Sequence, residues 1–393
     1  MSKILLATEA VTESSPVRRL ALVADALRRR GHDTIVAAGD LLAATALAEG
    51  NSLIALPVLA PARRPSVAAA GYSGLLIDSG FLDAPALHTL ANGCDTLLAQ
   101  IAPDAIVLDR APVLSLASWG KPRLLIGEGA HLPPPGYDRL RSLGGDAAQS
   151  RAASMQELVM GAILRVQNRR FRPAPDCPAD VFSASERLIC TLAEFDPFVA
   201  ERTDRNIGPL QAAPQPSDPW AARPEAPRII AVVDGDYPHL TPLLAALAQR
   251  GLKGELYVAE LPGPLKMMAE QAGVLVRFAA WPADDALQAA QIVVHHGEQM
   301  AVEHLLALGR PQLLLPRAAE QIVRGQILAS RGIGALVTEA EHLRALDKIV
   351  ARLAADRGVH ERAYAWARTV QEEFNKQGAE LAADAAERLA LAG

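Results

Sequence analysis

The stretch from Gln291 to Val337 constrains the fold of this 393-residue chain more than any other segment. It reads QIVVHHGEQMAVEHLLALGRPQLLLPRAAEQIVRGQILASRGIGALV. The apolar run Ile292–Val294 is typical of a buried parallel strand, and the apolar spacing after it indicates a helix that ends at Gly309. Pro311 prevents that helix from continuing, and Gln312–Leu315 is predicted to be a second buried strand.

A second helix completes this unit. Pro316 opens a loop that carries Glu320 and Gln321, and the helix after it is predicted to run to Gly332. The stretch is therefore a β-α-β-α unit whose loops leave the carboxyl ends of two strands. Open parallel sheets bind ligands at such ends, so we expect a ligand site here.

The same stretch resembles the donor-binding segment of GT-B-fold glycosyltransferases that use nucleotide sugars. That pattern runs His-Gly-Gly-x-Gly-Thr, then Glu, then Gly-Val-Pro, an apolar strand, Pro, and an Asp-Gln or Glu-Gln pair. Aligned on Gly309 and Pro311, the chain keeps five further positions of the pattern: His296, Gly297, Pro316, Glu320 and Gln321. It departs from the pattern at four others: Glu298 and Met300 replace glycines, Ala301 replaces Thr, and His304 replaces the ribose-binding Glu.

The resemblance implies roles for the residues that are kept. His296 and Gly297 would hold the diphosphate of the donor at the start of a helix, where backbone amides and the helix dipole favour anions. Glu320 and Gln321 would bond to the sugar hydroxyls, a task that suits a carboxylate and an amide. The same residues also have ordinary interpretations, since His296 could simply cap the helix and Glu320 could simply favour the helix dipole. His295 is expected to be a core histidine.

Acidic residues near the expected diphosphate count against ordinary donor binding. Glu298 adds a carboxylate to the turn, and Asp234 and Asp236 add two more in a facing loop. Two like charges about 4 Å apart repel by ~1 kcal/mol in water and by ~4 kcal/mol at an effective dielectric of 20. A diphosphate therefore needs compensation from Arg317, Arg324 or a cation, unless the carboxylates point away. Arg324 and His304 are therefore also expected at the donor site, His304 at the ribose-binding position, although it cannot accept two ribose hydroxyl bonds as a Glu does.

The first 40 residues are similar to the start of a GT-B N-terminal domain, with a strand at Ile4–Ala7, a loop, and a helix that ends before Gly31. In the family this loop is glycine-rich and ends in a His that acts as the catalytic base. Pro16 occupies the position of that His here. Glu9 and Glu13 are the candidate catalytic residues that remain in the loop.

The segment Gly127–Gly136, GEGAHLPPPG, resembles the acceptor-side loop of the same enzymes. Its Glu128 and His131 follow a predicted strand at Leu124–Gly127, so we expect both on the acceptor side. An inverting transfer needs a group that takes the proton of the acceptor hydroxyl, and His131 and Glu128 are two further candidates for that base. Each of the four base candidates could instead be an ordinary loop residue.

Composition supports a soluble α/β protein. Half the residues are hydrophobic but only 4% are aromatic, which is usual for helix-covered parallel sheets. A net charge of -5 gives no reason to expect a nucleic-acid partner. No apolar run reaches the roughly 18 residues of a membrane span. Because the first residues are predicted to enter a core strand directly, we expect no signal peptide, and we expect the three cysteines to be reduced thiols. We therefore expect a cytoplasmic protein.

The expected fold is α/β of the GT-B type, with two Rossmann-like domains facing each other across a cleft. Residues 1–212 would form the acceptor-side domain and 228–356 the donor-side domain, joined by a Pro-rich linker at 213–227. Residues 357–393 would be helices that return to the first domain, as the final helix of GT-B proteins does.

Three functions fit this fold. The first is transfer of a sugar, expected to be a hexose, from a nucleotide sugar to a small-molecule or glycan acceptor, with no metal ion or bound cofactor. The second is a catalytically inactive GT-B protein that acts by binding, for example as the partner subunit of an active transferase. The third is a GT-B protein recruited to other chemistry. Fold alone cannot separate them.

Overall fold

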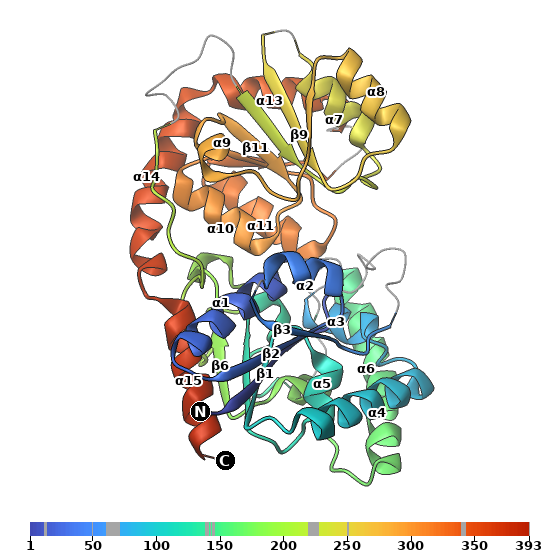
Figure 1. Ribbon diagram of the computed structural model, residues 1–393. Helices are drawn as coiled ribbons and strands as arrows, with labels where there is room; N and C mark the ends of the chain where they lie inside the picture. The colour runs from blue at the N-terminus through green and yellow to red at the C-terminus, as the bar shows by residue number, and fades with distance from the viewer. Residues whose placement is uncertain are drawn as a thin grey trace. The chain divides into compact units, whose positions relative to one another are not determined.

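A computed structural model of the chain describes residues 1–11, 14–48, 50–59, 71–137, 141, 143, 146–218, 228–249, 251–338 and 343–392. The chain forms two compact units. The first comprises Met1–Ala212, Ala318–Glu320 and Glu373–Gly393, and the second comprises Ala213–Arg317 and Gln321–Glu372. Each unit contains one parallel β-sheet with helices on both faces (Figure 1).

The sheet of the first unit has seven parallel strands in the order β3-β2-β1-β4-β5-β6-β7. The strands are β1 (Lys3–Thr8), β2 (Asp33–Ala38), β3 (Ser52–Ala55), β4 (Ala105–Leu108), β5 (Arg123–Gly127), β6 (Glu186–Ile189) and β7 (Arg205–Asn206). The order reverses between β1 and β4, so the loops after these two strands leave the same edge in opposite directions. In open parallel sheets such a switch point is where ligands bind.

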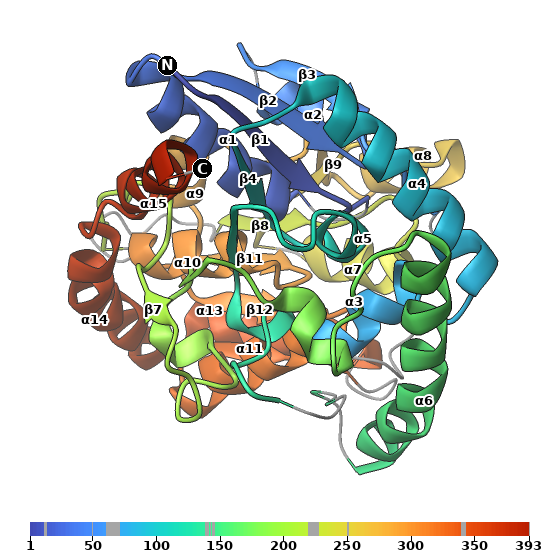
Figure 2. The same ribbon diagram turned by 90° about the horizontal axis from the view of Figure 1, so that it is seen from below.

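Helices cover this sheet on both faces because its strands are apolar on both faces. Ile4 and Leu6 of β1 pack with α1 (Ser15–Arg29) and α15 (Gly378–Ala392), whereas Leu5 and Ala7 pack with the other layer. That layer contains α3 (Tyr72–Asp78), α4 (Ala84–Ile101), α5 (Pro112–Ala117) and α6 (Asp146–Arg169). Figure 2 shows the two layers on opposite sides of the sheet. The remaining helical elements of the unit are α2 (Leu41–Leu47) and the short 3-10 turns η1 (Gly129–His131), η2 (Pro178–Phe182) and η3 (Ala193–Phe195).

The second unit has six parallel strands in the order β10-β9-β8-β11-β12-β13. They are β8 (Arg228–Val232), β9 (Lys253–Val258), β10 (Leu275–Phe278), β11 (Ile292–His295), β12 (Gln312–Leu314) and β13 (Gly334–Leu336). One face packs on α7 (Leu240–Leu247), α8 (Gly263–Gln271) and α13 (Leu346–Ala355). The other packs on α9 (Asp284–Gln288) and α10 (Gln299–Leu308), with α11 (Ala319–Ser330) next in the chain (Figure 1). The switch point lies between β8 and β11.

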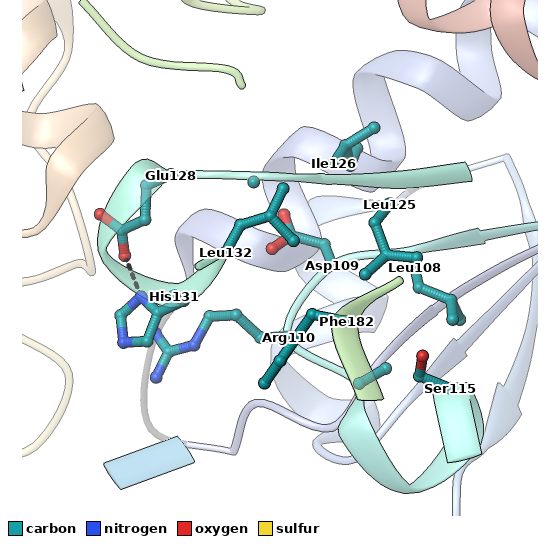
Figure 3. A pocket seen from close by; sticks show the side chains of 12 residues that line it. Leu108, Asp109, Arg110, Ser115, Leu125, Ile126, Glu128, His131, Leu132 and Phe182 are labelled. Atoms are coloured by element: carbon teal, nitrogen blue, oxygen red, sulfur yellow. Dashed lines mark hydrogen bonds and ion pairs between the residues drawn. The ribbon is translucent and has the colours of Figure 1, made fainter. Parts of the chain in front are cut away.

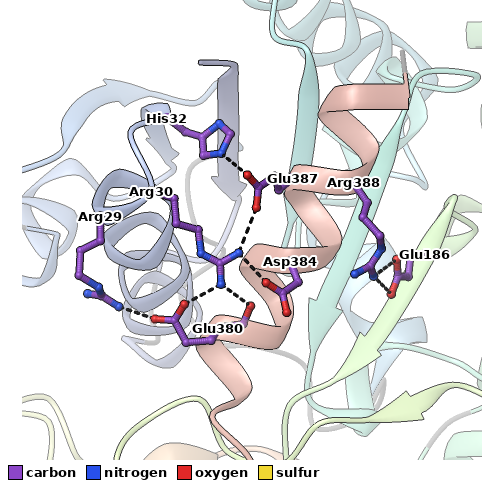
Figure 4. Close-up of polar contacts among 8 residues, drawn as sticks. All are labelled: Arg29, Arg30, His32, Glu186, Glu380, Asp384, Glu387 and Arg388. Atoms are coloured by element: carbon purple, nitrogen blue, oxygen red, sulfur yellow. Dashed lines mark hydrogen bonds and ion pairs between the residues drawn. The ribbon is translucent and has the colours of Figure 1, made fainter.

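The last two helices lead the chain from the second unit back to the first. α14 (Arg357–Phe374) includes the boundary at Glu373, and α15 belongs wholly to the first unit. Arg30 at the end of α1 holds α15 through Glu380 (Nη2–Oε2, 2.7 Å), Asp384 (Nη1–Oδ1, 2.6 Å) and Glu387 (Nη1–Oε2, 3.2 Å). Figure 4 shows this cluster together with Arg29, His32 and the Arg388–Glu186 pair.

The prediction of a parallel α/β fold with two sheets is confirmed, and every strand predicted in the 291–337 stretch is present. The strand β13 was not predicted, because Gly334–Leu336 is only three residues long and half-buried. Of the predicted linker, residues 219–227 lie outside the described residues. Among the residues described here, no helix is both long and apolar enough to cross a membrane.

Candidate functional site

The turn between β11 and α10 is the centre of the candidate site in the second unit. Its Gly297 has φ +98°, which L residues rarely adopt, and a Cβ there would lie 2.8 Å from Leu314 Cδ2. Glycine is therefore required for the chain to turn this close to β12. α10 then runs to Gly309, whose φ of +78° ends the helix in the left-handed conformation expected from the sequence.

His295 is the core histidine that the sequence predicted. It is 2% exposed, its Nε2 lies 2.9 Å from Gln312 Oε1, and its Nδ1 accepts the Gly297 N–H at 3.2 Å. Burial lowers the pKa of His295 to about 4, although the bond to Gln312 opposes the shift. The ring is therefore neutral near pH 7, with its proton on Nε2.

His296 uses both of its ring nitrogens within the protein. Nδ1 lies 2.8 Å from the Leu315 carbonyl oxygen and so carries the proton, while Nε2 accepts the Asp234 backbone N–H at 3.1 Å. Burial lowers the pKa of His296, and the nearby Asp234 carboxylate opposes that shift. His296 therefore joins the turn to the loop after β8. It can donate to a ligand only if the Asp234 contact is exchanged.

Two side chains of α11 complete the turn. Arg324 is 3% exposed and donates from Nη1 to the Gly297 carbonyl oxygen at 2.7 Å. Gln321 is 5% exposed and accepts the Arg317 backbone N–H on Oε1 at 2.6 Å, which fixes the loop after β12. The structure thus brings four predicted donor-binding residues together at the carboxyl ends of β11 and β12: His296, Gly297, Gln321 and Arg324.

The other two predicted donor-binding residues lie elsewhere. His304 bonds through Nε2 to Asp284 Oδ1 at 2.8 Å, and its ring lies 6.4 Å from that of Trp281. Its described partners therefore belong to α9 and the segment before it. Glu320 is buried at the start of α11, in the short segment that groups with the first unit, and its Oε1 lies 3.7 Å from His131 Nε2 of that unit.

Arg317 neutralises the acidic loop after β8. Its Nη1 lies 2.5 Å from Asp234 Oδ2 and 2.7 Å from Asp236 Oδ1. Both carboxylates remain more than half exposed. The charge expected to compensate a diphosphate is therefore already paired with two carboxylates. Tyr237 of the same loop, which the sequence did not single out, places its ring 5.0 Å from that of His296.

The first unit holds the predicted catalytic residues differently. Glu9 lies just after β1, is 8% exposed, and accepts the Leu114 backbone N–H at the start of α5 at 2.8 Å. Burial raises its pKa to about 8, against the opposing effect of the backbone hydrogen bonds that it accepts. Glu13 lies outside the described residues.

Glu128 and His131 form a bonded pair at the end of β5. His131 Nδ1 lies 2.7 Å from Glu128 Oε1, and each side chain is about one-twentieth exposed. The turn between them is fixed by a buried ion pair, because Arg202 binds both the Asp196 carboxylate and the Gly129 carbonyl oxygen. A Cβ on Gly129 would lie 2.0 Å from Asp196 Oδ1, so this position requires glycine.

A small cavity lies beside this pair, at the carboxyl ends of β4 and β5 (Figure 3). Its volume of about 10 Å³ is close to the least that holds one water molecule. Glu128 and His131 lie at one end, and the apolar lining includes Leu108, Leu125 and Phe182. Asp109 also lines the cavity, but it is fully buried and bonded to Arg19 by both oxygens, at 2.6 and 3.1 Å. The sequence did not indicate this pair, whose members are 90 positions apart.

Comparison with known proteins identifies the fold. The chain matches no protein-family model, and no curated protein matches it in sequence. Among solved structures it is similar to the calicheamicin glycosyltransferase CalG4, with 20% identity over 99% of this chain and 98% of that one and a TM-score of 0.71. The glycosyltransferase VinC in complex with dTDP matches with 16% identity over all of both chains and a TM-score of 0.64.

A third match is the spinosyn rhamnosyltransferase SpnG in complex with thymidine diphosphate. It has 17% identity over 97% of this chain and 98% of that one, with a TM-score of 0.64. All three matches extend over nearly the full length of the chain. The chain therefore has the GT-B glycosyltransferase fold that its sequence predicted.

Proposed function

We propose that the protein transfers a sugar from a nucleoside diphosphate sugar to a hydroxyl-bearing acceptor. One observation supports the proposal: four residues expected at the donor site from the sequence alone lie together at the carboxyl ends of β11 and β12. They are His296, Gly297, Gln321 and Arg324; Arg324 donates to the Gly297 carbonyl oxygen, and the Gln321 Cβ lies 3.4 Å from where a Cβ on Gly297 would be. Residues that matched the family pattern only by chance would not need to lie together in the folded chain, so their proximity supports a shared role.

Each of these residues has a task that matches its chemistry. Gly297 lets the chain turn close to Leu314 of β12, and an oxygen of the diphosphate would bind at the N-terminus of α10 that follows, where backbone amides and the helix dipole favour anions. Arg324 keeps the turn in place by holding the Gly297 carbonyl, and it adds positive charge behind it. The Gln321 amide supplies both a donor and an acceptor for the sugar hydroxyls. None of these tasks requires a metal ion.

Thymidine diphosphate is the nucleotide to test first, because the structures of SpnG and VinC hold it. The test is thermal unfolding of the full chain with thymidine, uridine, adenosine and guanosine diphosphates at millimolar concentration. A ligand at 100 times its dissociation constant stabilises the native state by about 2.7 kcal/mol. We expect a clear shift with thymidine diphosphate; no shift with any of the four would refute the donor site.

Variants on one helix assign the shift to the site. Gln321→Ala removes a buried amide from the proposed donor site, whereas Gln326→Ala removes an exposed amide from the same helix. We expect the shift that thymidine diphosphate glucose induces to fall in Gln321→Ala and to stay unchanged in Gln326→Ala. Equal shifts in the two variants would place the sugar of the donor elsewhere.

The contacts of two residues favour a second candidate, a GT-B protein that binds a ligand or a protein partner without catalysis. Arg317 is paired with Asp234 and Asp236, and His296 spends both ring nitrogens inside the protein. To bind through Arg317 or through His296 Nε2, a diphosphate has to displace one of these contacts. If thymidine diphosphate binds but its sugar ester is never turned over, this second function replaces the first.

A further inference from the structure

We infer that His131, held by Glu128, is the catalytic base of the proposed transfer. The inference rests on the proposed function and names the group that takes the acceptor's proton. It places that group in the loop after β5, whereas the family resemblance points to the position of Pro16, which lies in the first turn of α1. Four observations of the first unit support it.

The first observation is that two neighbouring carboxyl groups are unsuited to the task. Glu9 has a pKa of about 8 because it is buried, so most of it already holds a proton at neutral pH. Its oxygen is also occupied by the Leu114 N–H. Asp109 accepts hydrogen bonds from the Arg19 guanidinium on both of its oxygens in a site with no exposure, so an acceptor hydroxyl cannot reach it.

The second observation is the tautomer of His131. An ionised Glu128 can only accept, so the 2.7 Å contact puts the imidazole proton on Nδ1. The lone pair is then on Nε2, the nitrogen that must take a proton from an acceptor. This is the arrangement in which a carboxylate orients a histidine base and stabilises the cation that forms.

The third observation is the charge around Nε2. Glu320 Oε1 lies 3.7 Å away, which is beyond hydrogen-bond distance, so the lone pair on Nε2 is not used by that carboxylate. Once protonated, the imidazolium lies between two carboxylates, Glu128 and Glu320. Both carboxylates are less than one-tenth exposed and lie within 4 Å of the ring, one at each nitrogen.

The fourth observation is the rigidity of the loop. Asp196 and Arg202, both nearly fully buried, hold the Gly129 turn from outside, and Arg187 donates to the Pro133 carbonyl beyond it. A base acts efficiently only when its geometry is fixed before the substrate arrives. These contacts fix the backbone that carries His131, as a catalytic base requires.

In the proposed step, His131 Nε2 removes the proton of the acceptor hydroxyl as its oxygen attacks the anomeric carbon of the donor. The new glycosidic C–O bond forms while the bond from the anomeric carbon to the phosphate oxygen breaks. The nucleoside diphosphate leaves with that electron pair. The proton remains on His131 until it is lost to solvent, so no further reactant is needed.

Azide separates loss of a base from loss of structure. Azide is an anionic nucleophile that needs no deprotonation, whereas water or an alcohol does. We would measure release of thymidine diphosphate from thymidine diphosphate glucose, in water and with added sodium azide, for the wild-type chain, His131→Gln, and the control His88→Gln on α4. A general base contributes about 10²–10⁴-fold, so we expect His131→Gln to slow hydrolysis by that factor and azide to restore release with glucosyl azide as product.

The outcomes are distinct. Two results would overturn the inference alone. In the first, His131→Gln hydrolyses the donor at the wild-type rate. In the second, azide does not restore the lost release, although thymidine diphosphate still shifts the unfolding temperature of the variant. A wild-type chain that binds the nucleotide but releases none from its glucose ester overturns the proposed transfer, and the base assignment with it. Glu128→Gln is the second variant, and we expect it to lose hydrolysis less than His131→Gln and to be restored by azide in the same way.

Discussion

The buried carboxyl group of Glu9 makes the stability of the first unit depend on pH in a way that one substitution should remove. Glu9 caps the start of α5 from a site that is 8% exposed, and its pKa rises from an ordinary 4.5 to about 8. Because the folded-state pKa is the higher one, the protonated Glu9 side chain contributes its full stabilisation to the folded state below about pH 4.5. That contribution is lost as the pH rises through about 8.

The size of the effect follows from the two pKa values. Between them the unfolded chain is ionised at this residue and the folded chain is not, so stability falls by about 1.4 kcal/mol per pH unit. Across the full interval the loss is on the order of 5 kcal/mol, and between pH 5 and 8.5 it is about 4 kcal/mol. Glu9→Gln cannot ionise, yet its amide oxygen can still accept the Leu114 N–H.

The assay is urea unfolding of wild type and Glu9→Gln at several pH values from 5 to 8.5, with Glu157→Gln on the exposed face of α6 as the control. We expect the free energy of unfolding of Glu9→Gln to gain about 4 kcal/mol on wild type across that range, while Glu157→Gln follows wild type. Other titrating groups cancel in the difference. Parallel curves for wild type and Glu9→Gln would refute the reasoning.

Three further predictions concern other parts of the chain. Arg310 is fully buried, burial lowers its pKa to about 10, and it donates to the carbonyls of Gln288, Ala290 and Leu308. Arg310→Met leaves these carbonyls without their donor, so we expect urea unfolding to show a loss of more than about 3 kcal/mol in the free energy of unfolding. Arg30→Ala, which removes the centre of the cluster in Figure 4, should cost only about 1–2 kcal/mol, with a smaller loss in 1 M salt, because its carboxylate partners are a third to a half exposed. Replacing Asp234 and Asp236 together by Asn frees Arg317 and should tighten thymidine diphosphate binding by about tenfold in calorimetry; weaker binding would contradict that role.

The backbone of the donor-side unit could be predicted because its signals are local. Gly309 and Pro311 define the end of α10 and the start of β12 through conformations that few other residues adopt. Once the end of α10 and the start of β12 are known, the spacing in the sequence places His296 and Gly297 at the carboxyl end of β11.

The sequence did not predict which side chains form hydrogen bonds and ion pairs with residues far away in the chain. Arg324 could have pointed to a ligand or, as the structure has it, to the carbonyl of Gly297, and its spacing on α11 is the same in both cases. The pairing of Arg19 with Asp109, and of Arg202 with Asp196 behind the Gly129 turn, depends on packing that no local pattern encodes.

His304 and Glu128 illustrate the same limit in opposite directions. The alignment placed His304 where the family binds ribose, but a short bond to Asp284 gives it a different partner. Glu128 and His131 were expected only as acceptor-side residues or as two of four candidate bases, and their mutual bond is what distinguishes them. Spacing of three residues allows such a pair but does not require it.

Time-resolved ³¹P nuclear magnetic resonance of thymidine diphosphate glucose with the wild-type chain would show directly whether the protein cleaves a nucleotide sugar. We expect the signal of the sugar-bearing phosphate to disappear and that of free thymidine diphosphate to appear, at a rate proportional to protein concentration. A donor that binds, by the shift of its signals, but remains intact for hours at stoichiometric protein would contradict it. The fold would then serve binding alone.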